Sequence, residues 1–260
     1  MATTSKIKRI LNCQASKGTE TDWNFEDAVA AKVIPKTGKI PASKDLRAAW
    51  WKIWDQKDTG ACVGFATADG VLRWHYVQAE KIPEKQLMSP RFIWMANKET
   101  DNFTDYPTTF IEPSGTSTKL ALRVAQRYGC VLEDMLSMEG GLSQLNTNVF
   151  YSVAASYRIN SYHNLGLNLD DWRRWLALNG PILTRLVVDS SWMKATQTKG
   201  KLTKYRDDAS GGHAVCLVGY TKDHFVVRNS WGTDWGDKGF AYASNDYAQA
   251  AFTEAYGAVM

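Results

Sequence analysis

Cys62 is the residue whose position most clearly indicates chemistry. It follows a short polar loop, DQKDTGA over residues 55–61, and begins the run CVGFATADGVLRWHYVQAEK. Apolar side chains recur in this run at roughly helical spacing, so the thiol lies at the N-terminus of a predicted helix. Unpaired backbone N–H groups and the positive end of the helix dipole favour the thiolate there, and the thiolate is the nucleophilic form of cysteine. A small residue that packs the start of the helix is the alternative, because free cysteines are often buried.

His213 and Asn229 are candidates for the partners that a nucleophilic thiolate needs. Such a nucleophile requires a base or an imidazolium, a group that orients it, and donors for the oxyanion. His213 follows two glycines and begins a predicted strand, and Asn229 ends a later one. A hairpin between these strands would let the amide oxygen of Asn229 accept from the imidazole and fix its tautomer. Trp231 follows closely, and an indole over this hydrogen bond would exclude water and strengthen it.

The remaining cysteines form no recognisable site. Cys13, Cys130 and Cys216 show no CxxC spacing and no dense pattern in this chain of 260 residues. This argues against a disulfide scaffold and against a zinc site, and neither a metal nor a cofactor is expected. Cys216 lies in the β-rich run HAVCLVGY, where core packing is its predicted role.

The charge and hydropathy of the chain argue against several classes of partner. There are 31 Lys and Arg against 27 Asp and Glu, and the one basic run, SKIKR at residues 5–9, is too short to indicate nucleic-acid binding. No apolar run approaches the roughly 18–20 residues that span a bilayer, so no membrane partner is expected. The first residues contain no extended apolar region of a signal peptide. This predicts a cytoplasmic protein and leaves release by another route open.

The hydrophobic pattern changes character along the chain. Helices are predicted from residue 62 to about 81, over 89–100, over 115–130 and over 169–180. Ser89 caps the second of these, and Pro90 takes its first helical position. Four β-like runs follow in the second half, namely ILTRLVV, HAVCLVGY, HFVVRNS and GFAYAS. Helices followed by strands predict an α+β protein with a helical lobe and a sheet or barrel lobe.

Taken together, these segments resemble the papain-like cysteine peptidases. The stretch GGHAVCLVGY around His213 is similar to the family's histidine strand, and RNSWGTDWGDKGF around Asn229 resembles its asparagine–tryptophan motif at almost every position. IPASKDLR resembles the start of the mature domain, and SGTSTKLALRVAQRYG resembles the glycine stretch of the cleft and the helix after it. The separation of Cys62 and His213 is close to the family's range of about 130–150 residues. The resemblance covers about residues 40–260 and is strongest to short bacterial or phage-type members.

The resemblance implies a two-lobe fold with the active site in the cleft between the lobes. The helical lobe, about residues 50–145, carries the cysteine. An antiparallel β-barrel-like lobe, about residues 146–260, carries the histidine and the asparagine. Residues 1–39 precede this catalytic domain as an extension, which either lies across the cleft as a short pro-segment or plug or packs on the back.

The resemblance also implies roles for individual residues in an endopeptidase that hydrolyses peptides or proteins through an acyl-enzyme. Cys62 is the nucleophile, His213 is its imidazolium partner, and Asn229 orients the imidazole. Gln56 falls at the position of the oxyanion-hole glutamine, and Trp231 supports the site. The positions that fall on the substrate-binding surface of the family are Gly115, Arg185 and Ala214.

The sequence departs from the family pattern around the nucleophile and in one pocket. Where the family signature reads C-G-[SA]-C-[WY], residues 59–63 read TGACV. Thr59 replaces the first cysteine, so its usual disulfide is not expected, and Val63 replaces an aromatic wall of the cleft. Arg185 falls near the floor of the pocket for the second residue before the scissile bond, which predicts a preference for a polar or acidic residue there. A register slip of one residue would instead turn Arg185 to solvent.

Two other functions are compatible with the same motifs. Peptide ligation or amide deconjugation uses the same acyl-enzyme, because the acceptor decides between hydrolysis and transfer. A non-catalytic peptide-binding module would keep the fold, but such a module usually lacks the cysteine, the histidine or the glutamine. All three are present here. The physiological substrate and the oligomeric state stay open.

Overall fold

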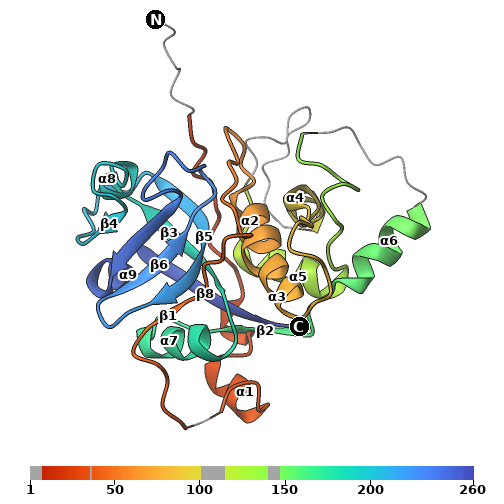
Figure 1. The fold of residues 1–260 in the computed structure, drawn as a ribbon, viewed down its shortest axis with the longest axis horizontal. Helices are drawn as coiled ribbons and strands as arrows, with labels where there is room; N and C mark the ends of the chain where they lie inside the picture. Colours follow the sequence, from red (N-terminus) through yellow and green to blue (C-terminus); the bar gives the residue numbers. More distant parts are fainter. Residues whose placement is uncertain (1–7, 36, 101–114, 140–146) are drawn as a thin grey trace, which may run out of the picture.

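The computed structural model describes residues 8–35, 37–100, 115–139 and 147–260, with the backbone alone given for residues 98–100. They form a helical lobe and a sheet lobe that lie side by side (Figure 1). This confirms the predicted α+β fold with two lobes. The helices are α1 Phe25–Ala30, α2 Cys62–Phe65, a π-helical stretch Ala66–Leu72, α3 Arg73–Gln78, α4 Pro90–Thr100, α5 Thr118–Arg127, α6 Thr147–Ser156, α7 Leu169–Leu178, α8 Ser190–Met193 and α9 Asn245–Ala251, with a 3-10 turn at Thr19–Thr21. The strands are β1 Lys44–Asp45, β2 Ser161–Asn164, β3 Ile182–Val188, β4 Lys201–Leu202, β5 Gly211–Tyr220, β6 His224–Arg228, β7 Phe240–Ser244 and β8 Phe252–Val259.

The helix that begins at Cys62 lies against both the other helices and the sheet. It comprises α2, the π-helical stretch and α3, and every side chain from Cys62 to Leu72 is buried. Gly70 lies where this helix packs against β5. The approach is so close that a Cβ at this position would overlap the sulfur of Cys216. The Cys216 thiol donates a hydrogen bond to the carbonyl oxygen of Ala66 at 3.0 Å. The helix of Cys62 is thus set directly on the strand that carries the histidine, and Cys216 has the packing role that the sequence predicted.

The rest of the helical lobe packs around this helix. The Ser89 hydroxyl accepts from the backbone N–H of Phe92 at 3.0 Å, so the predicted cap of α4 is present. The rings of Phe92 and Phe150 lie 5.8 Å apart, which places α6 against α4. Residues 147–156, which the sequence analysis assigned to the start of the β lobe, therefore pack on the helical lobe.

The sheet orders its strands β2-β8-β3-β5-β6-β7-β4, with β1 paired to β5. The pairs along this path are antiparallel except β4 with β7. In the β3–β5 pair Arg185 lies opposite Ala214, and in the β3–β8 pair it lies opposite Glu254. The predicted barrel-like lobe is wrong in one respect: the sheet is open, because its two end strands, β2 and β4, do not pair with each other in the described chain.

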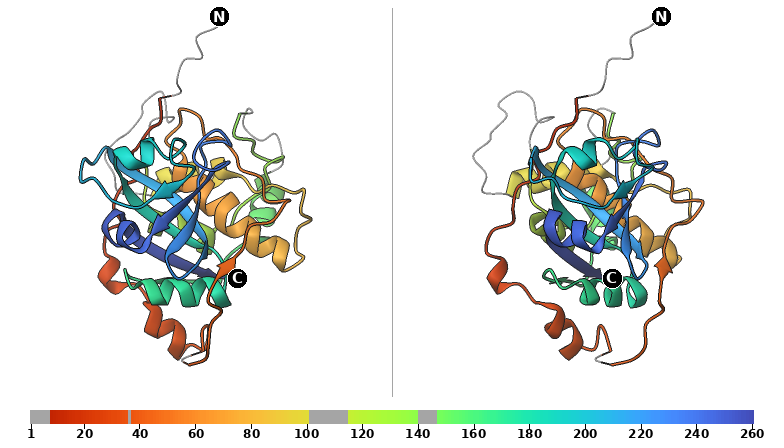
Figure 2. Two further views of the ribbon diagram at one scale, coloured as in Figure 1. Left: turned by 60° about the vertical axis from the view of Figure 1, so that its left-hand side comes forward. Right: turned by 90° about the vertical axis from the view of Figure 1, so that its left-hand side faces the viewer.

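The N-terminal segment from residue 8 to residue 18 contacts both lobes before the chain reaches α1. In both views of Figure 2 it runs from the top of the molecule down to α1 at the bottom. Asn12 forms a parallel bridge with Gly212 at the start of β5, and Gln14 N–H donates to the carbonyl oxygen of Thr116 at 2.9 Å. The first contact is with the sheet lobe and the second with the helical lobe, so the segment lies across the junction between them.

Candidate active site

The Cys62 thiol lies at the start of α2 and is fully buried. Several donors face it and lower its pKa well below the ordinary value of 9.0. The largest contribution is a hydrogen bond from the thiol of Cys13, and the His213 imidazole and the backbone N–H of Ala214 also lower this pKa. Burial opposes them, because desolvation favours the neutral thiol. The donors prevail, and their net effect favours the thiolate form of Cys62.

His213 and Asn229 form a buried hydrogen bond of 2.8 Å between Nε2 and Oδ1. Asn229 Oδ1 also accepts from the backbone N–H of Ser230 at 2.9 Å. An amide oxygen only accepts, so Nε2 of His213 carries a hydrogen and donates it. Nδ1 of the same ring is buried and makes no hydrogen bond to a nitrogen or oxygen among the described residues. The ring is therefore oriented by Asn229, and its second nitrogen is left for the Cys62 thiol.

Aromatic side chains cover this pair. The ring of Trp231 lies 4.9 Å from the His213 imidazole, and that of Trp192 lies 5.8 Å from it in an edge-on arrangement. Trp192 also packs on Trp235 at 4.6 Å. Such a cover excludes water and strengthens the buried hydrogen bond. The sequence analysis singled out Trp231 but missed Trp192, since the stretch DSSWMK around it carries no signal beyond the high Trp content of the chain.

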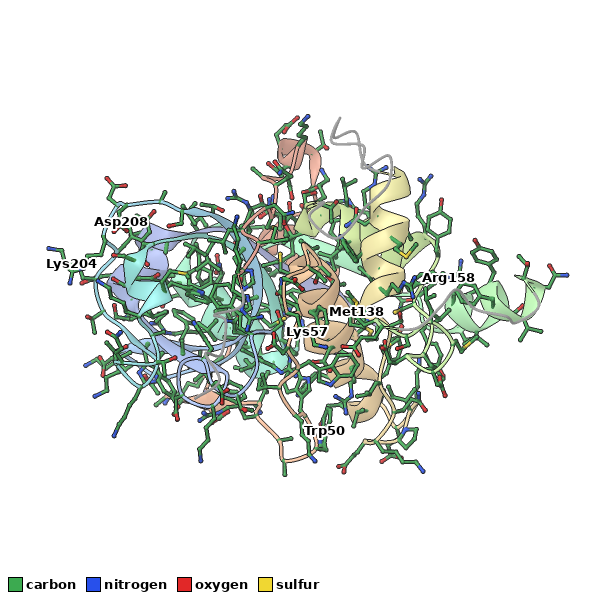
Figure 3. All side chains as sticks on the ribbon, turned by 90° about the horizontal axis from the view of Figure 1, so that it is seen from above. Trp50, Lys57, Met138, Arg158, Lys204 and Asp208 are labelled. Atoms are coloured by element: carbon green, nitrogen blue, oxygen red, sulfur yellow. The ribbon has the colours of Figure 1, made fainter. Side chains whose placement is uncertain are left out.

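Gln56 lies buried beside the site with its amide orientation fixed. Its Oε1 accepts from the Ser230 hydroxyl at 2.7 Å, and its Nε2 donates to the carbonyl oxygen of Thr59 at 2.9 Å. Ser230 follows Asn229, so one loop of the sheet lobe holds both the imidazole partner and the glutamine. Lys57 has a left-handed φ of 55° and an ion pair with Glu139. Seen from above, the exposed Lys57 lies between the two lobes, close to Met138 (Figure 3).

Two of the three predicted substrate-binding residues, Gly115 and Arg185, lie beside residues 12 and 13, and the third, Ala214, lies beside Cys62. A Cβ on Gly115 would overlap the carbonyl oxygen of Asn12. Arg185 donates from Nε to the carbonyl oxygen of Cys13 at 3.0 Å, and it is only partly buried. Ala214 is buried and acts on Cys62 through its backbone N–H. The N-terminal segment thus occupies the surface on which these residues are predicted to hold a substrate.

Two residues near the site had no signal in the sequence. Cys13 contacts the nucleophile itself, although it lies in the polar extension. Glu254 accepts from the backbone N–H and hydroxyl of Ser16 at 2.7 and 2.6 Å, and from the Thr118 hydroxyl at 2.6 Å. Glu254 lies opposite Arg185 in the β3–β8 pair, so side chains of opposite charge are neighbours where the sequence analysis predicted Arg185 near the floor of a pocket.

Neither a metal cluster nor a membrane span is found in the part of the chain that the structure describes. There, no group of three or more His, Cys, Asp or Glu side chains could hold a metal ion. No helix among the same residues is long and apolar enough to cross a membrane. All four cysteines are free.

We expect Cys62 to react with iodoacetamide at lower pH than an ordinary thiol. Only the thiolate reacts, so the rate rises with pH through the pKa, and a lowered pKa moves the midpoint below pH 9.0. His213→Ala removes one of the groups that lower this pKa and should move the midpoint upward. The rate of carbamidomethylation at Cys62, followed by peptide mapping from pH 4 to about pH 10, measures both. An unchanged midpoint in His213→Ala would contradict the pairing, and Cys130, whose pKa burial raises, serves as the slow reference.

The chain matches the family model described as "Papain family cysteine protease" over residues 40–257. Among curated proteins it is 25% identical over 201 residues to an uncharacterised peptidase C1-like protein of Acanthamoeba polyphaga mimivirus, covering 72% of this chain and 62% of that protein. It is 33% identical over 85 residues to a cathepsin B-like protein of Giardia intestinalis, covering 31% of this chain and 28% of that protein. The aligned parts thus span less than two thirds of these relatives.

The fold is shared with solved structures of the same class. Xylellain, a cysteine protease from Xylella fastidiosa, superposes with a TM-score of 0.78 at 20% identity, over 100% of this chain and 99% of that one. A procathepsin B of Trypanosoma congolense superposes with a TM-score of 0.70 at 17% identity, over 96% and 86% of the two chains. Because the family model matches most of the chain and these structures share its two lobes, the chain belongs to the papain family of cysteine proteases.

Proposed function

We propose that the chain is a cysteine endopeptidase, which hydrolyses peptide bonds through Cys62 and His213. The observation that carries this proposal is a buried thiol at a helix N-terminus whose pKa is lowered in part by the His213 imidazole, while Nε2 of that imidazole donates to Asn229 at 2.8 Å. A thiolate with an oriented imidazole is the arrangement that activates a cysteine nucleophile. The family membership and the cysteine proteases among the relatives support the same activity.

In the proposed mechanism the Cys62 thiolate attacks the carbonyl carbon of the scissile peptide bond. The oxyanion that forms accepts hydrogen bonds from the Gln56 amide and the backbone N–H of Cys62. His213 donates a proton to the leaving amine while Asn229 holds the ring in place. The same imidazole then takes a proton from water, which releases the acyl group from the sulfur.

The experiment that tests the function is cleavage of an unstructured protein by the full chain under reducing conditions, read by product mass. We expect fragments whose summed masses exceed the intact substrate by one water for each bond cut, because hydrolysis adds water to the acyl-enzyme. Joined fragments without added water would indicate ligation. Intact substrate after incubation with the folded, reduced chain, and also with an Arg9→Ala variant whose N-terminal segment is released from the cleft, would contradict both and would leave peptide binding without catalysis.

We also propose that residues 8–18 block the cleft of the resting protein. The support is the contact of Arg9 with Asp55 and with the carbonyl oxygens of Lys57 and Trp231, the last at 3.0 Å. Cleavage by Arg9→Ala should therefore be faster than by the unaltered chain, whereas Arg47→Ala, which removes a surface ion pair with Asp45, should have no effect on the rate. Equal rates for all three proteins would argue against a blocking segment.

The subtype, the localisation and the specificity are further proposals. The chain and the Xylella fastidiosa structure superpose over nearly their whole lengths, which supports a short bacterial subtype. Most of the curated relatives are eukaryotic proteins, so this subtype stays a prediction. Cytoplasmic localisation also stays a prediction. For specificity, Arg185 faces the carbonyl oxygen of Cys13, which supports a pocket that accepts polar groups, and Glu254 beside it would disfavour acidic ones.

A further inference from the structure

Cys13 is held in place by both of its backbone polar groups. Its N–H donates to the carbonyl oxygen of Gly212 at 3.0 Å, and its own carbonyl oxygen accepts from Arg185 Nε at 3.0 Å. Gly212 directly precedes His213, and a Cβ on Gly212 would overlap the Cys13 carbonyl oxygen. The backbone of Cys13 is thus packed against the strand that carries the imidazole.

The side chain of Cys13 is directed at the nucleophile. Its thiol interacts with that of Cys62 and also donates to the carbonyl oxygen of Gln14 at 3.8 Å, and the two cysteine side chains are 2% and 0% exposed. Burial, followed by the Cys62 contact, raises the pKa of Cys13 well above 9.0, whereas the same contact lowers that of Cys62. The interaction therefore favours the proton on Cys13 and the thiolate on Cys62, so that a thiol with a raised pKa lies beside one with a lowered pKa.

We propose that peroxide converts Cys13 and Cys62 into an intramolecular disulfide, which closes the active site reversibly. The proposal rests on the proposed function only because it uses the Cys62 thiolate as the group that reacts first. A stabilised thiolate beside a second thiol is the arrangement in which a sulfenic acid is trapped as a disulfide. In the resulting state the nucleophile is consumed, and the segment from residue 8 to residue 18 is bound covalently across the cleft.

The chemistry balances with hydrogen peroxide as the oxidant. The Cys62 thiolate attacks one peroxide oxygen, the O–O bond breaks, and the hydroxide released takes a proton to become water. The Cys13 sulfur then attacks the sulfur of the Cys62 sulfenic acid, so that the S–S bond forms as the S–O bond breaks. The second hydroxide leaves as water with the proton of Cys13. Two thiols are thus oxidised by two electrons, and one peroxide is reduced to two waters.

The other two cysteines are engaged elsewhere. Cys216 donates to Ala66 O at 3.0 Å, and Cys130 donates to Ser89 O at 3.5 Å. Both lie in the core, where burial raises their pKa values. Neither is a thiolate, and neither contributes to the lowered pKa of Cys62. Oxidation is therefore expected to select one pair out of the four cysteines.

The test is treatment of the reduced full chain with dilute hydrogen peroxide, followed by alkylation and peptide mapping without reductant. We expect a linked pair of peptides that contain Cys13 and Cys62, with Cys130 and Cys216 still alkylated. Dithiothreitol should restore alkylation of both linked cysteines. In Cys13→Ala the sulfenic acid lacks its partner, so Cys62 should advance to the sulfinic and sulfonic acids, and the fraction restored by reductant should fall about tenfold or more. Cys130→Ala, a matched change in the core, should form the same disulfide as the unaltered chain.

Two results would overturn the proposed Cys13–Cys62 disulfide. One is irreversible oxidation of Cys62 in the unaltered chain with Cys13 still a free thiol. The other is a disulfide that joins Cys130, Cys216 or two separate chains. The disulfide is read from the mass of the linked peptides and does not require peptidase activity, so the two proposals can fail separately. A chain that forms the Cys13–Cys62 disulfide but cuts no peptide after reduction would contradict the peptidase alone. Peptide cleavage by a chain that forms no disulfide would contradict the disulfide alone.

Discussion

Replacing Cys62 by alanine is expected to lower kcat for peptide cleavage by at least about 10⁴-fold, because the acyl-enzyme can no longer form. The residual rate would come from substrate binding and from stabilisation of the transition state by the oxyanion donors, which act without the nucleophile. Of the predictions made for catalysis this is the largest, since Gln56, His213 and Asn229 act through the bond that the thiolate forms. The measurement is the initial rate of release of new amino termini from an unstructured protein at saturating concentration.

Cys130→Ala is the matched control for this loss. Both thiols are fully buried and belong to the helical lobe, but the hydrogen bonds of the Cys130 thiol go to the carbonyl oxygens of Ser89 and Val131, outside the site. It should retain kcat, with some loss of stability from the cavity that alanine leaves. If Cys62→Ala cleaved at a rate similar to that of Cys130→Ala, the nucleophile would have to be another group, and the proposed mechanism would be wrong.

The largest stability effect is expected from Asp69→Ala, which should reduce the free energy of unfolding by about 3–5 kcal/mol. Asp69 lies in the π-helical stretch and accepts from Arg73 at 3.0 Å and from Arg228 at 2.5 Å. The side chains of all three residues are no more than 3% exposed. Arg228 belongs to β6, so this carboxylate joins the helix of Cys62 to the sheet that carries His213.

The size of this effect follows from what the substitution leaves behind. Two guanidinium groups stay buried without their counter-charge, although Arg73 keeps Glu84 O at 2.7 Å and Arg228 keeps Lys52 O at 2.8 Å. Removing one member of a buried ion-pair network leaves an uncompensated buried charge. The resulting loss of stability is larger than any stability that the intact network adds relative to apolar side chains in its place. Urea unfolding at neutral pH, followed by far-UV circular dichroism, measures the difference.

Asp170→Ala provides the matched comparison for an ion pair at the surface. Asp170 pairs with Arg173 one turn along α7 at 2.9 Å, and its side chain is 88% exposed. Solvent screens this pair, so its loss should cost at most about 1 kcal/mol. Equal destabilisation by the two substitutions would show that the network of Asp69 does not hold the lobes together.

The sequence by itself determined the local elements and the family. Helical spacing after Cys62 and the Ser89–Pro90 start of α4 are properties of consecutive residues, and both were readable without the fold. The strands β3, β5, β6 and β7 were equally visible, because each is a short apolar run bounded by turn residues. By contrast, α6 and β8 escaped notice, since the run FTEAYGAV mixes small and polar residues and does not alternate cleanly.

The tertiary structure decided which distant residues meet. Glu254 joins Arg185 only because β8 pairs with β3, and Trp192 covers His213 only because α8 folds back over the sheet. Cys13 meets Cys62 through the hydrogen bonds that lay its segment between Gly212 and Thr116. Periodicity and motif spacing describe neighbours along the chain, whereas such contacts depend on the register of strands and the path of a loop. A cysteine in a polar extension was therefore unremarkable in the sequence, and its position against the nucleophile is a property of the fold alone.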